Sequence, residues 1–167
     1  RGIELDYDMD GTVFLLDWSD VGECHENDGI HRTSGRIYRI TYGNQKAGKH
    51  DLAKKTSEEL ANLLNNPNQK ISRHSARLLQ ERSTVKAIDN KTIAQLRNKK
   101  DGNAIQTRLR ALWALHSMGN LKEKEVRSLV KDKNEHMRIW AMKIMVDNGK
   151  ASKEASKAII EHAHSEK

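Results

Sequence analysis

Four aspartates near the N-terminus have the spacing of a calcium-binding loop. They follow the pattern D-x-D-x-D-G, with a fourth acid after five more residues, at Asp6, Asp8, Asp10 and Asp17. Carboxylates two positions apart can face one hard cation, and Gly11 allows the sharp turn that such loops need. The last position holds Asp instead of the longer bidentate Glu, and strand-like residues follow the glycine, which argues against an EF-hand. The pattern therefore predicts either a calcium loop between two strands or an acidic β-turn, and we favour the turn.

A second group of reactive side chains lies in the polar stretch that follows. It combines carboxylates, a thiol, imidazoles and a guanidinium, at Asp20, Glu23, Cys24, His25, His31 and Arg32. The adjacent Cys24 and His25 rarely ligate one zinc or iron ion together, and further ligands are not evident. No C-x-x-C-H motif occurs in the chain, so we expect no covalent c-type haem. We expect these groups to hydrogen-bond one another and to order the loop, and the cluster is the candidate for a metal-assisted site.

Two short strands must position these groups. The pattern predicts them at Thr12–Asp17 and Arg36–Tyr42, with the long polar loop between them. A two-stranded hairpin is marginally stable in water, and long loops without regular structure are uncommon in compact domains. We therefore interpret residues 1–48 as the edge of a larger β-structure. The chain also opens on Arg1, as an excised segment does, and we expect it to be part of a longer protein.

Charge divides the chain into two regions. Residues 1–43 carry 9 acidic and 4 basic side chains, whereas the remainder carries 14 acidic and 26 basic ones, a net charge of +12. The mean hydropathy of −0.84 predicts a thin core, but the regular apolar spacing argues against disorder. A single cysteine excludes an internal disulfide, and no apolar run is long enough to span a membrane.

Residues 49–167 have the periodicity of helices. Thr56 followed by two glutamates predicts a helix start, and Asn65-Asn66-Pro67 predicts its end, with Pro67 well placed to begin the next helix. We predict shorter helices at Glu58–Leu64, Lys91–Arg97 and Lys122–Val130, and a final capping helix at Ser152–His162.

Three windows that start at an arginine align without gaps. They are RHSARLL, RLRALWA and RIWAMKI, in which Arg recurs at steps of 35 and 30 residues and Ala follows three positions later, giving the repeat positions Arg73, Ala76, Arg108, Ala111, Arg138 and Ala141. The small alanine suits close helix packing, and we expect the arginines to bind loop carbonyls or an acid. The windows resemble HEAT-type repeats over about residues 51–150, which implies a mainly α fold: an α-α superhelix of about three helix pairs and a capping helix.

The basic helical region also allows nucleic-acid binding on a concave face. Two observations disfavour this reading. Lysine mixed with glutamate is typical of solvated helix faces. Trp113 and Trp140 fall at or beside buried positions of the repeat windows, so exposed aromatic rings for stacking on bases are lacking. We therefore favour a protein partner on the face of the solenoid.

The N-terminal region resembles one protein family closely. The segments Asp10-Gly11, Asp17-Trp18, Gly22-Glu23-Cys24-His25, His31-Arg32 and Gly35-Arg36-Ile37-Tyr38 look like the final β-propeller segment of the multidomain "putative membrane-bound dehydrogenases" of planctomycete-like bacteria. In those proteins a propeller similar to that of quinoprotein sugar dehydrogenases precedes a HEAT-like region and often a c-type cytochrome domain.

The resemblance spans nearly the whole chain and implies a periplasmic or envelope location for the parent protein. It also implies a scaffold role for this chain, between a propeller and a cytochrome, without a catalytic residue of its own. The order of β-segment, linker and helix repeats gives the expected domains: 1–48 and 49–167.

Overall fold

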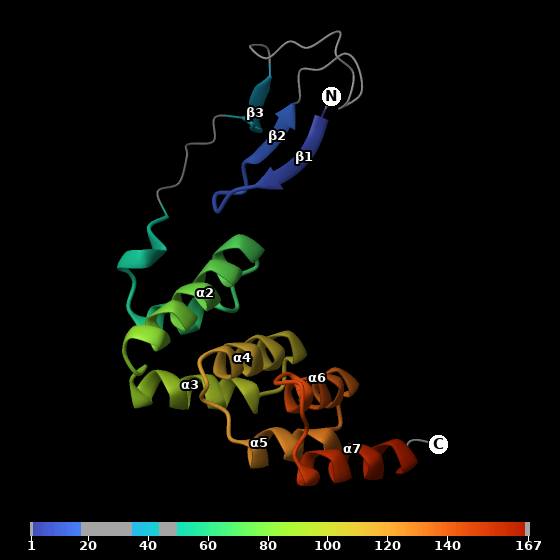
Figure 1. The fold of residues 1–167 in the computed structure, drawn as a ribbon. Coiled ribbons are helices and arrows are strands. Elements are labelled where there is room, and N and C mark those ends of the chain that lie inside the picture. The colour runs from blue at the N-terminus through green and yellow to red at the C-terminus, as the bar shows by residue number, and fades with distance from the viewer. Residues whose placement is uncertain (1, 18–34, 44–49, 166–167) are drawn as a thin grey trace.

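The computed structural model describes residues 2–17, 35–43 and 50–165. A small antiparallel sheet lies at the N-terminal end, and seven α-helices form the remainder of the described chain (Figure 1). The expected fold class, mainly helical with a small N-terminal β-unit, is confirmed. Whether the helices form a HEAT-like superhelix stays a prediction.

The sheet has three strands, not the two that the sequence predicts. β1 (Gly2–Tyr7), β2 (Val13–Asp17) and β3 (Arg36–Ile40) pair in that order, all antiparallel. β1 was missed because its alternating apolar residues run directly into the acidic motif, which reads as a loop. The other two strands were predicted in the right places, with β3 ending two residues earlier than expected.

The predicted acidic turn connects β1 to β2. The amide of Gly11 donates to the carbonyl of Asp8 (3.0 Å), and the amide of Asp8 donates to the carbonyl of Thr12 (2.8 Å). Gly11 has a φ of +84°, in the left-handed region where glycine has no steric penalty. The turn is therefore a compact hairpin connection, held by backbone bonds and a glycine.

This turn is also the contact between the sheet and the helices. The side-chain amide of Asn68 donates to the carbonyls of Asp8 (3.0 Å) and Met9 (3.1 Å), and Met9 packs against the hydrophobic core of the helical part. At this turn the β-hairpin therefore packs on the first helices.

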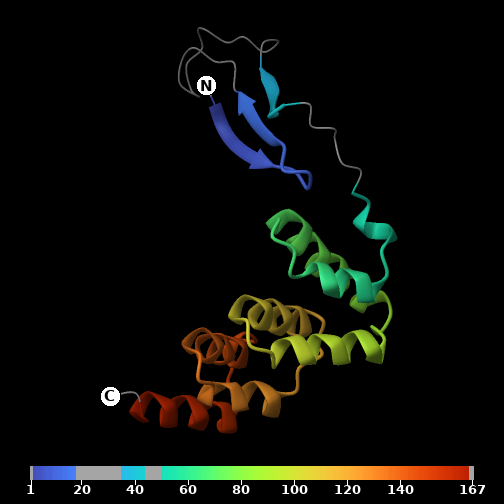
Figure 2. The same cartoon turned by 180° about the vertical axis from the view of Figure 1, so that it is seen from behind.

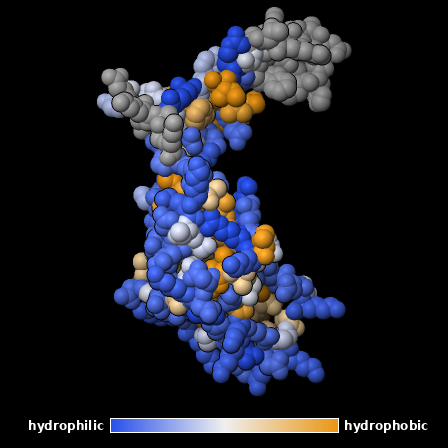
Figure 3. Space-filling model, turned by 90° about the vertical axis from the view of Figure 1, so that its left-hand side faces the viewer, coloured by the Kyte–Doolittle hydropathy of each residue, from blue (hydrophilic) through white to orange (hydrophobic). Residues whose placement is uncertain are grey.

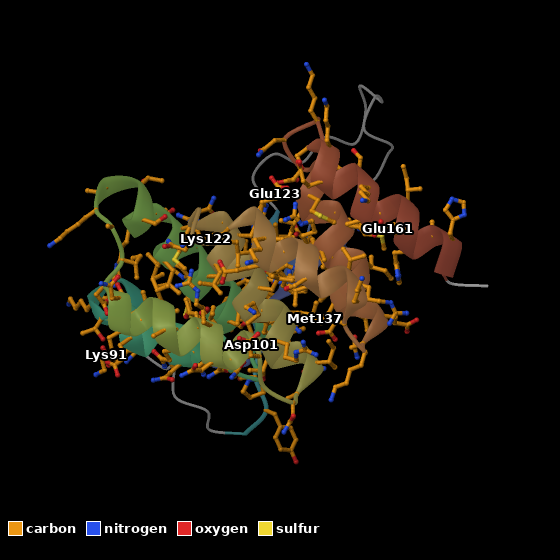
Figure 4. The ribbon with its side chains drawn as sticks, turned by 90° about the horizontal axis from the view of Figure 1, so that it is seen from below. Lys91, Asp101, Lys122, Glu123, Met137 and Glu161 are labelled. Carbon is orange, nitrogen blue, oxygen red and sulfur yellow. The ribbon has the colours of Figure 1, made fainter. Side chains whose placement is uncertain are left out.

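The helices are arranged in two layers. On one side α1 contacts α3 and α5 contacts α7, and on the other α4 contacts both α2 and α6 (Figures 1 and 2). Lys91 on α3 and Glu161 on α7 mark opposite ends of the stack in Figure 4. The bounds of the helices, with two short 3-10 turns η1 and η2, are: η1 Leu52–Lys54, α1 Ser57–Leu63, α2 Gln69–Val85, α3 Asn90–Lys100, α4 Ile105–Ser117, α5 Glu123–Ser128, η2 Leu129–Lys131, α6 Glu135–Val146 and α7 Lys153–Ser165.

Local signals set these helix bounds. Thr56 forms the predicted capping box, in which its hydroxyl accepts from the Glu59 amide and the Glu59 carboxylate accepts from its own amide. Pro67 does not begin α2, because Asn68 is the N-cap and accepts from the Lys70 amide (2.9 Å). At the end of α4, Gly119 (φ +68°) allows the Asn120 amide to reach the Leu115 carbonyl at 2.8 Å, a Schellman-type ending.

The core runs through the stack as two adjoining clusters. The first joins η1 and α1 to α4, and the second joins α4 to α6; α4 supplies Leu115 to the first and Leu112 to the second. Leu121 packs against both clusters. Each helix pair thus buries its apolar face against its neighbours, which is the organisation expected for repeats that are not stable singly.

Candidate interaction surfaces

The aspartates of the calcium-like motif are dispersed over the hairpin. The Asp6 carboxylate accepts from the Lys70 ammonium, which lowers the pKa of Asp6, and the Tyr7 amide lowers it further. In the turn, the Asp10 carboxylate accepts from the Thr12 amide (2.8 Å) and lies 3.5 Å from the Arg39 guanidinium. Asp6 and Asp10 therefore already have cationic partners.

The other two members of the motif lie apart. Asp8 caps its own turn by accepting from the Met9 amide (2.7 Å), and Asp17 lies at the far end of β2, opposite Arg36. Within the three described ranges, no three His, Cys, Asp or Glu side chains gather into a group that could hold a metal ion. Calcium binding by this motif stays a prediction.

The residues of the polar loop lie outside the described residues. This applies to every member of that candidate site: Asp20, Glu23, Cys24, His25, His31 and Arg32. The proposed hydrogen-bonded loop and the metal-assisted alternative are both untested.

The repeat arginine of α4 has the structural role that the sequence predicts. Arg108 is 7% exposed, and its Nε donates to the carbonyl of Lys100 at 2.9 Å. Its two terminal nitrogens bind both oxygens of Asp132, Nη1 at 3.1 Å. This bidentate pair lowers the pKa of Asp132 and joins the end of α3 to the turn before α6.

The next repeat arginine acts in a similar way. Nη1 of Arg138 donates to the carbonyls of Asp132 (3.1 Å) and Lys133 (3.4 Å), at the start of its own helix. The alanines of these two windows, Ala111 and Ala141, are buried in the core clusters, as predicted from their size.

The first repeat window is displaced by one residue. Arg73 is exposed, and in α2 the position that corresponds to Arg108 of α4 is held by Ser72. The Ser72 hydroxyl donates to the carbonyl of Leu64 (2.7 Å), eight positions earlier in the chain. Arg108 donates in the same way to the carbonyl of Lys100, also eight positions earlier. The N-caps Asn68 and Ala104 are separated by 36 positions, one more than in the gapless alignment. Ala76 is accordingly only half-buried, and Ser75 occupies the core position.

Three further arginines connect neighbouring elements, a role that the sequence did not predict for them. Arg82 of α2 donates to the carbonyl of Ala53 (2.8 Å), Arg97 of α3 to that of Asn120 (3.1 Å), and Arg110 of α4 to that of Leu64 (2.9 Å). Helix and turn carbonyls without intrahelical partners need such donors. No sequence pattern identifies these arginines, because each reaches a residue more than 20 positions away.

One face of the sheet is apolar and open. Strand register places six apolar side chains on it: Leu5, Tyr7, Val13, Leu15, Tyr38 and Ile40. Leu5 is 68% exposed and Ile40 52%, and hydrophobic atoms are visible on the sheet in Figure 3. A sheet usually buries its apolar face against a second layer. An exposed patch of this kind is a candidate interaction surface.

The tryptophans of the helical part are more accessible than predicted. Trp113 on α4 is 37% exposed and meets Trp140 on α6 edge to face, with 4.9 Å between ring centroids and 64° between planes. The Lys143 ammonium lies 5.0 Å from the centroid of Trp140. Trp113 lies beside buried positions, as predicted, because its neighbours Leu112 and Ala114 are buried. The expectation that neither ring is available for base stacking is wrong for Trp113, whose ring is partly exposed.

Within the described residues, no helix combines the length and the apolar character that crossing a membrane requires. Scans against protein-family models and against curated proteins find no match to this chain.

Proposed function

We propose that this chain is a non-catalytic scaffold and protein-interaction module of a larger envelope redox protein. In this proposal the sheet belongs to a quinoprotein-like β-propeller, and the helical stack sets the geometry between that propeller and a c-type cytochrome. The redox context and the periplasmic or envelope location rest on the sequence resemblance described above.

The observation that carries the proposal is the open apolar face of the sheet. The three strands pair in sequential order, all antiparallel. A propeller blade has four strands with this kind of pairing, so the sheet would supply three of them. Blades stack face to face, so the apolar side chains of one blade are covered by its neighbours. The exposed Leu5 and Ile40 would then be buried by adjacent blades of the parent protein.

The helical stack supports a scaffold role. The buried Arg108 joins separate elements of the stack. It binds Asp132, and the two side chains are 8% and 13% exposed. Bonds of this kind, together with two adjoining core clusters that extend from η1 to α6, hold neighbouring helix pairs in fixed positions. A HEAT-like superhelix of such pairs would present a long surface to a partner.

The proposal is tested on the native gene product. An antibody against residues 50–165 would detect it in membrane and periplasmic fractions of its own cells, and the captured product would be stained for covalent haem. We expect a band several times heavier than 19.1 kDa that carries haem. A haem-free product near 19.1 kDa would refute the proposed context.

A second function, nucleic-acid binding, is favoured by one specific observation. The exposed Trp113 offers a ring for base stacking, and residues 44–167 carry a net charge of +12. This reading requires binding to single- or double-stranded DNA that weakens steeply as salt is raised. An absence of binding at about 20 mM salt, well below the physiological range, would exclude it.

A further inference from the structure

A groove of about 340 Å³ lies between α2 and α4. Its apolar lining consists of Leu64, Ala76 and Leu109, and its polar lining includes the amides of Gln69 and Gln106. A volume of this size accommodates one or two amino-acid side chains. Leu64 lies at the C-terminal end of α1, and none of the groove's lining residues belongs to the sheet.

Two arginines give the groove a positive charge. The side chain of Arg73 is exposed and makes neither an ion pair nor a hydrogen bond within the described part of the chain. Arg110 is held in place because Nη1 donates to the carbonyls of Leu64 (2.9 Å) and Asn66 (3.3 Å), which leaves its other nitrogens available to a ligand. None of the residues that line the groove is acidic.

The aromatic residue at the groove is fixed before any ligand binds. Trp113 lines the groove on one side and contacts Trp140 on the other, and the Lys143 ammonium lies over the Trp140 ring. A ring positioned in this way loses little conformational entropy when a partner packs on it. Tryptophan and arginine are the residues that most often dominate the affinity of protein interfaces.

We propose that this groove binds an extended acidic peptide segment with an apolar side chain between its carboxylates. The apolar side chain would pack on Trp113 and Leu109, the carboxylates would pair with Arg73 and Arg110, and the glutamine amides would bind the peptide backbone. The inference rests on the scaffold role proposed above and names the chemistry of a partner.

The charge pattern favours a peptide over a nucleic acid. A phosphate backbone requires a row of available cations. On α2, the cations before and after Arg73 are already paired, Lys70 with Asp6 and Arg77 with Glu81 (2.7 Å). Two guanidinium groups around an apolar centre instead match two carboxylates around an apolar side chain.

The test uses the full 167-residue chain and a dye-labelled peptide, acetyl-Ser-Glu-Glu-Leu-Phe-Glu-Glu-Ser, in fluorescence anisotropy. We expect saturable binding that is lost when the four Glu of the peptide are replaced by Gln. The substitution Arg73→Glu should weaken binding about tenfold or more, because a charge-assisted contact becomes a repulsion. The matched control Arg77→Glu makes the same charge change on α2 outside the groove and should alter affinity less than about twofold.

Three results would overturn the inference. The first is the absence of saturable binding. The second is an equal loss of affinity in both variants, which would indicate an effect of net charge. The third is displacement of the peptide from an Arg73-dependent site by a ten-nucleotide single-stranded DNA. Urea unfolding of both variants shows whether each is folded; since both side chains are exposed, we expect midpoints near that of the wild type. The mass and haem content of the native product do not depend on this groove, so failure here is distinguishable from failure of the proposed function.

Discussion

The substitution Arg108→Ala should destabilise the helical stack far more than Arg73→Ala. The gapless alignment of the repeat windows makes the two arginines equivalent, but the structure buries Arg108 to 7% exposure and leaves Arg73 exposed. Removing Arg108 leaves the Asp132 carboxylate largely buried without its bidentate partner and leaves the Lys100 carbonyl without a donor.

The expected magnitude follows from these contacts. Removal of one partner from a buried ion pair costs roughly 3–5 kcal/mol. Because the Asp132 side chain is still 13% exposed and gains some hydration, we expect a loss of about 3 kcal/mol for Arg108→Ala, at the lower end of this range. Exposed substitutions without partners usually change stability by no more than about 0.5 kcal/mol, which is the expectation for Arg73→Ala.

Urea unfolding of the full chain, followed by far-UV circular dichroism, measures both values. A double-mutant cycle with Arg108→Met and Asp132→Asn separates the pair from the packing of the arginine stem. We expect the double variant to be more stable than the sum of the single losses predicts, with a coupling of about 1–3 kcal/mol. Equal losses in the two alanine variants, or strict additivity in the cycle, would refute the assigned role of the pair.

Three more predictions concern separate parts of the molecule. Because the pKa of Asp132 is lowered in the folded state, this carboxylate stabilises the fold above its ordinary pKa of 3.8, and the contribution is lost as pH falls through the lower folded value. The difference in unfolding free energy between wild type and Asp132→Asn should therefore close below pH 3.8. A difference independent of pH would contradict this. Asn68→Asp keeps the N-cap of α2 but removes the amide that donates to the hairpin turn. Hydrogen exchange of the Gly11 amide should therefore accelerate, while exchange of the helix amides stays unchanged. The control Asn134→Asp, at the N-cap of α6, should leave exchange of the Gly11 amide unaffected. Leu5→Asp should reduce the fluorescence of bound anilinonaphthalene sulfonate, because it interrupts the apolar face of the sheet. The control Ile160→Asp, at a comparably exposed site on α7, should change the fluorescence little. Equal effects of the two substitutions would mean that the dye does not report on the sheet.

Local sequence signals were sufficient for most of the helical part. The capping box at Thr56 and the break at Asn65–Pro67 were predicted from residues within four positions of one another, and both are present. β1 was missed for a related reason. Its alternation of apolar residues is short and overlaps the acidic motif, and a strand is defined by its pairing with β2, which a local pattern does not contain.

The candidate sites were less accessible to prediction. The sequence singled out the repeat arginines and their chemistry, and Arg108 and Arg138 bind the loop carbonyls and the acid that were expected. It did not show that Trp113 is exposed or that Arg110 reaches the end of α1, since both depend on where α2 lies beside α4. The apolar sheet face likewise required the register of all three strands.

The sequence by itself determined which segments are helical and where α1 is capped, and it showed that an arginine-alanine window recurs along the chain. Only the tertiary structure decided which residue of each unit faces the core. One position along a helix corresponds to a rotation of about 100° around its axis. A shift of one residue in the first window therefore turns Arg73 outward and brings Ser72 to the carbonyl of Leu64, with the free arginine left at the groove beside α4.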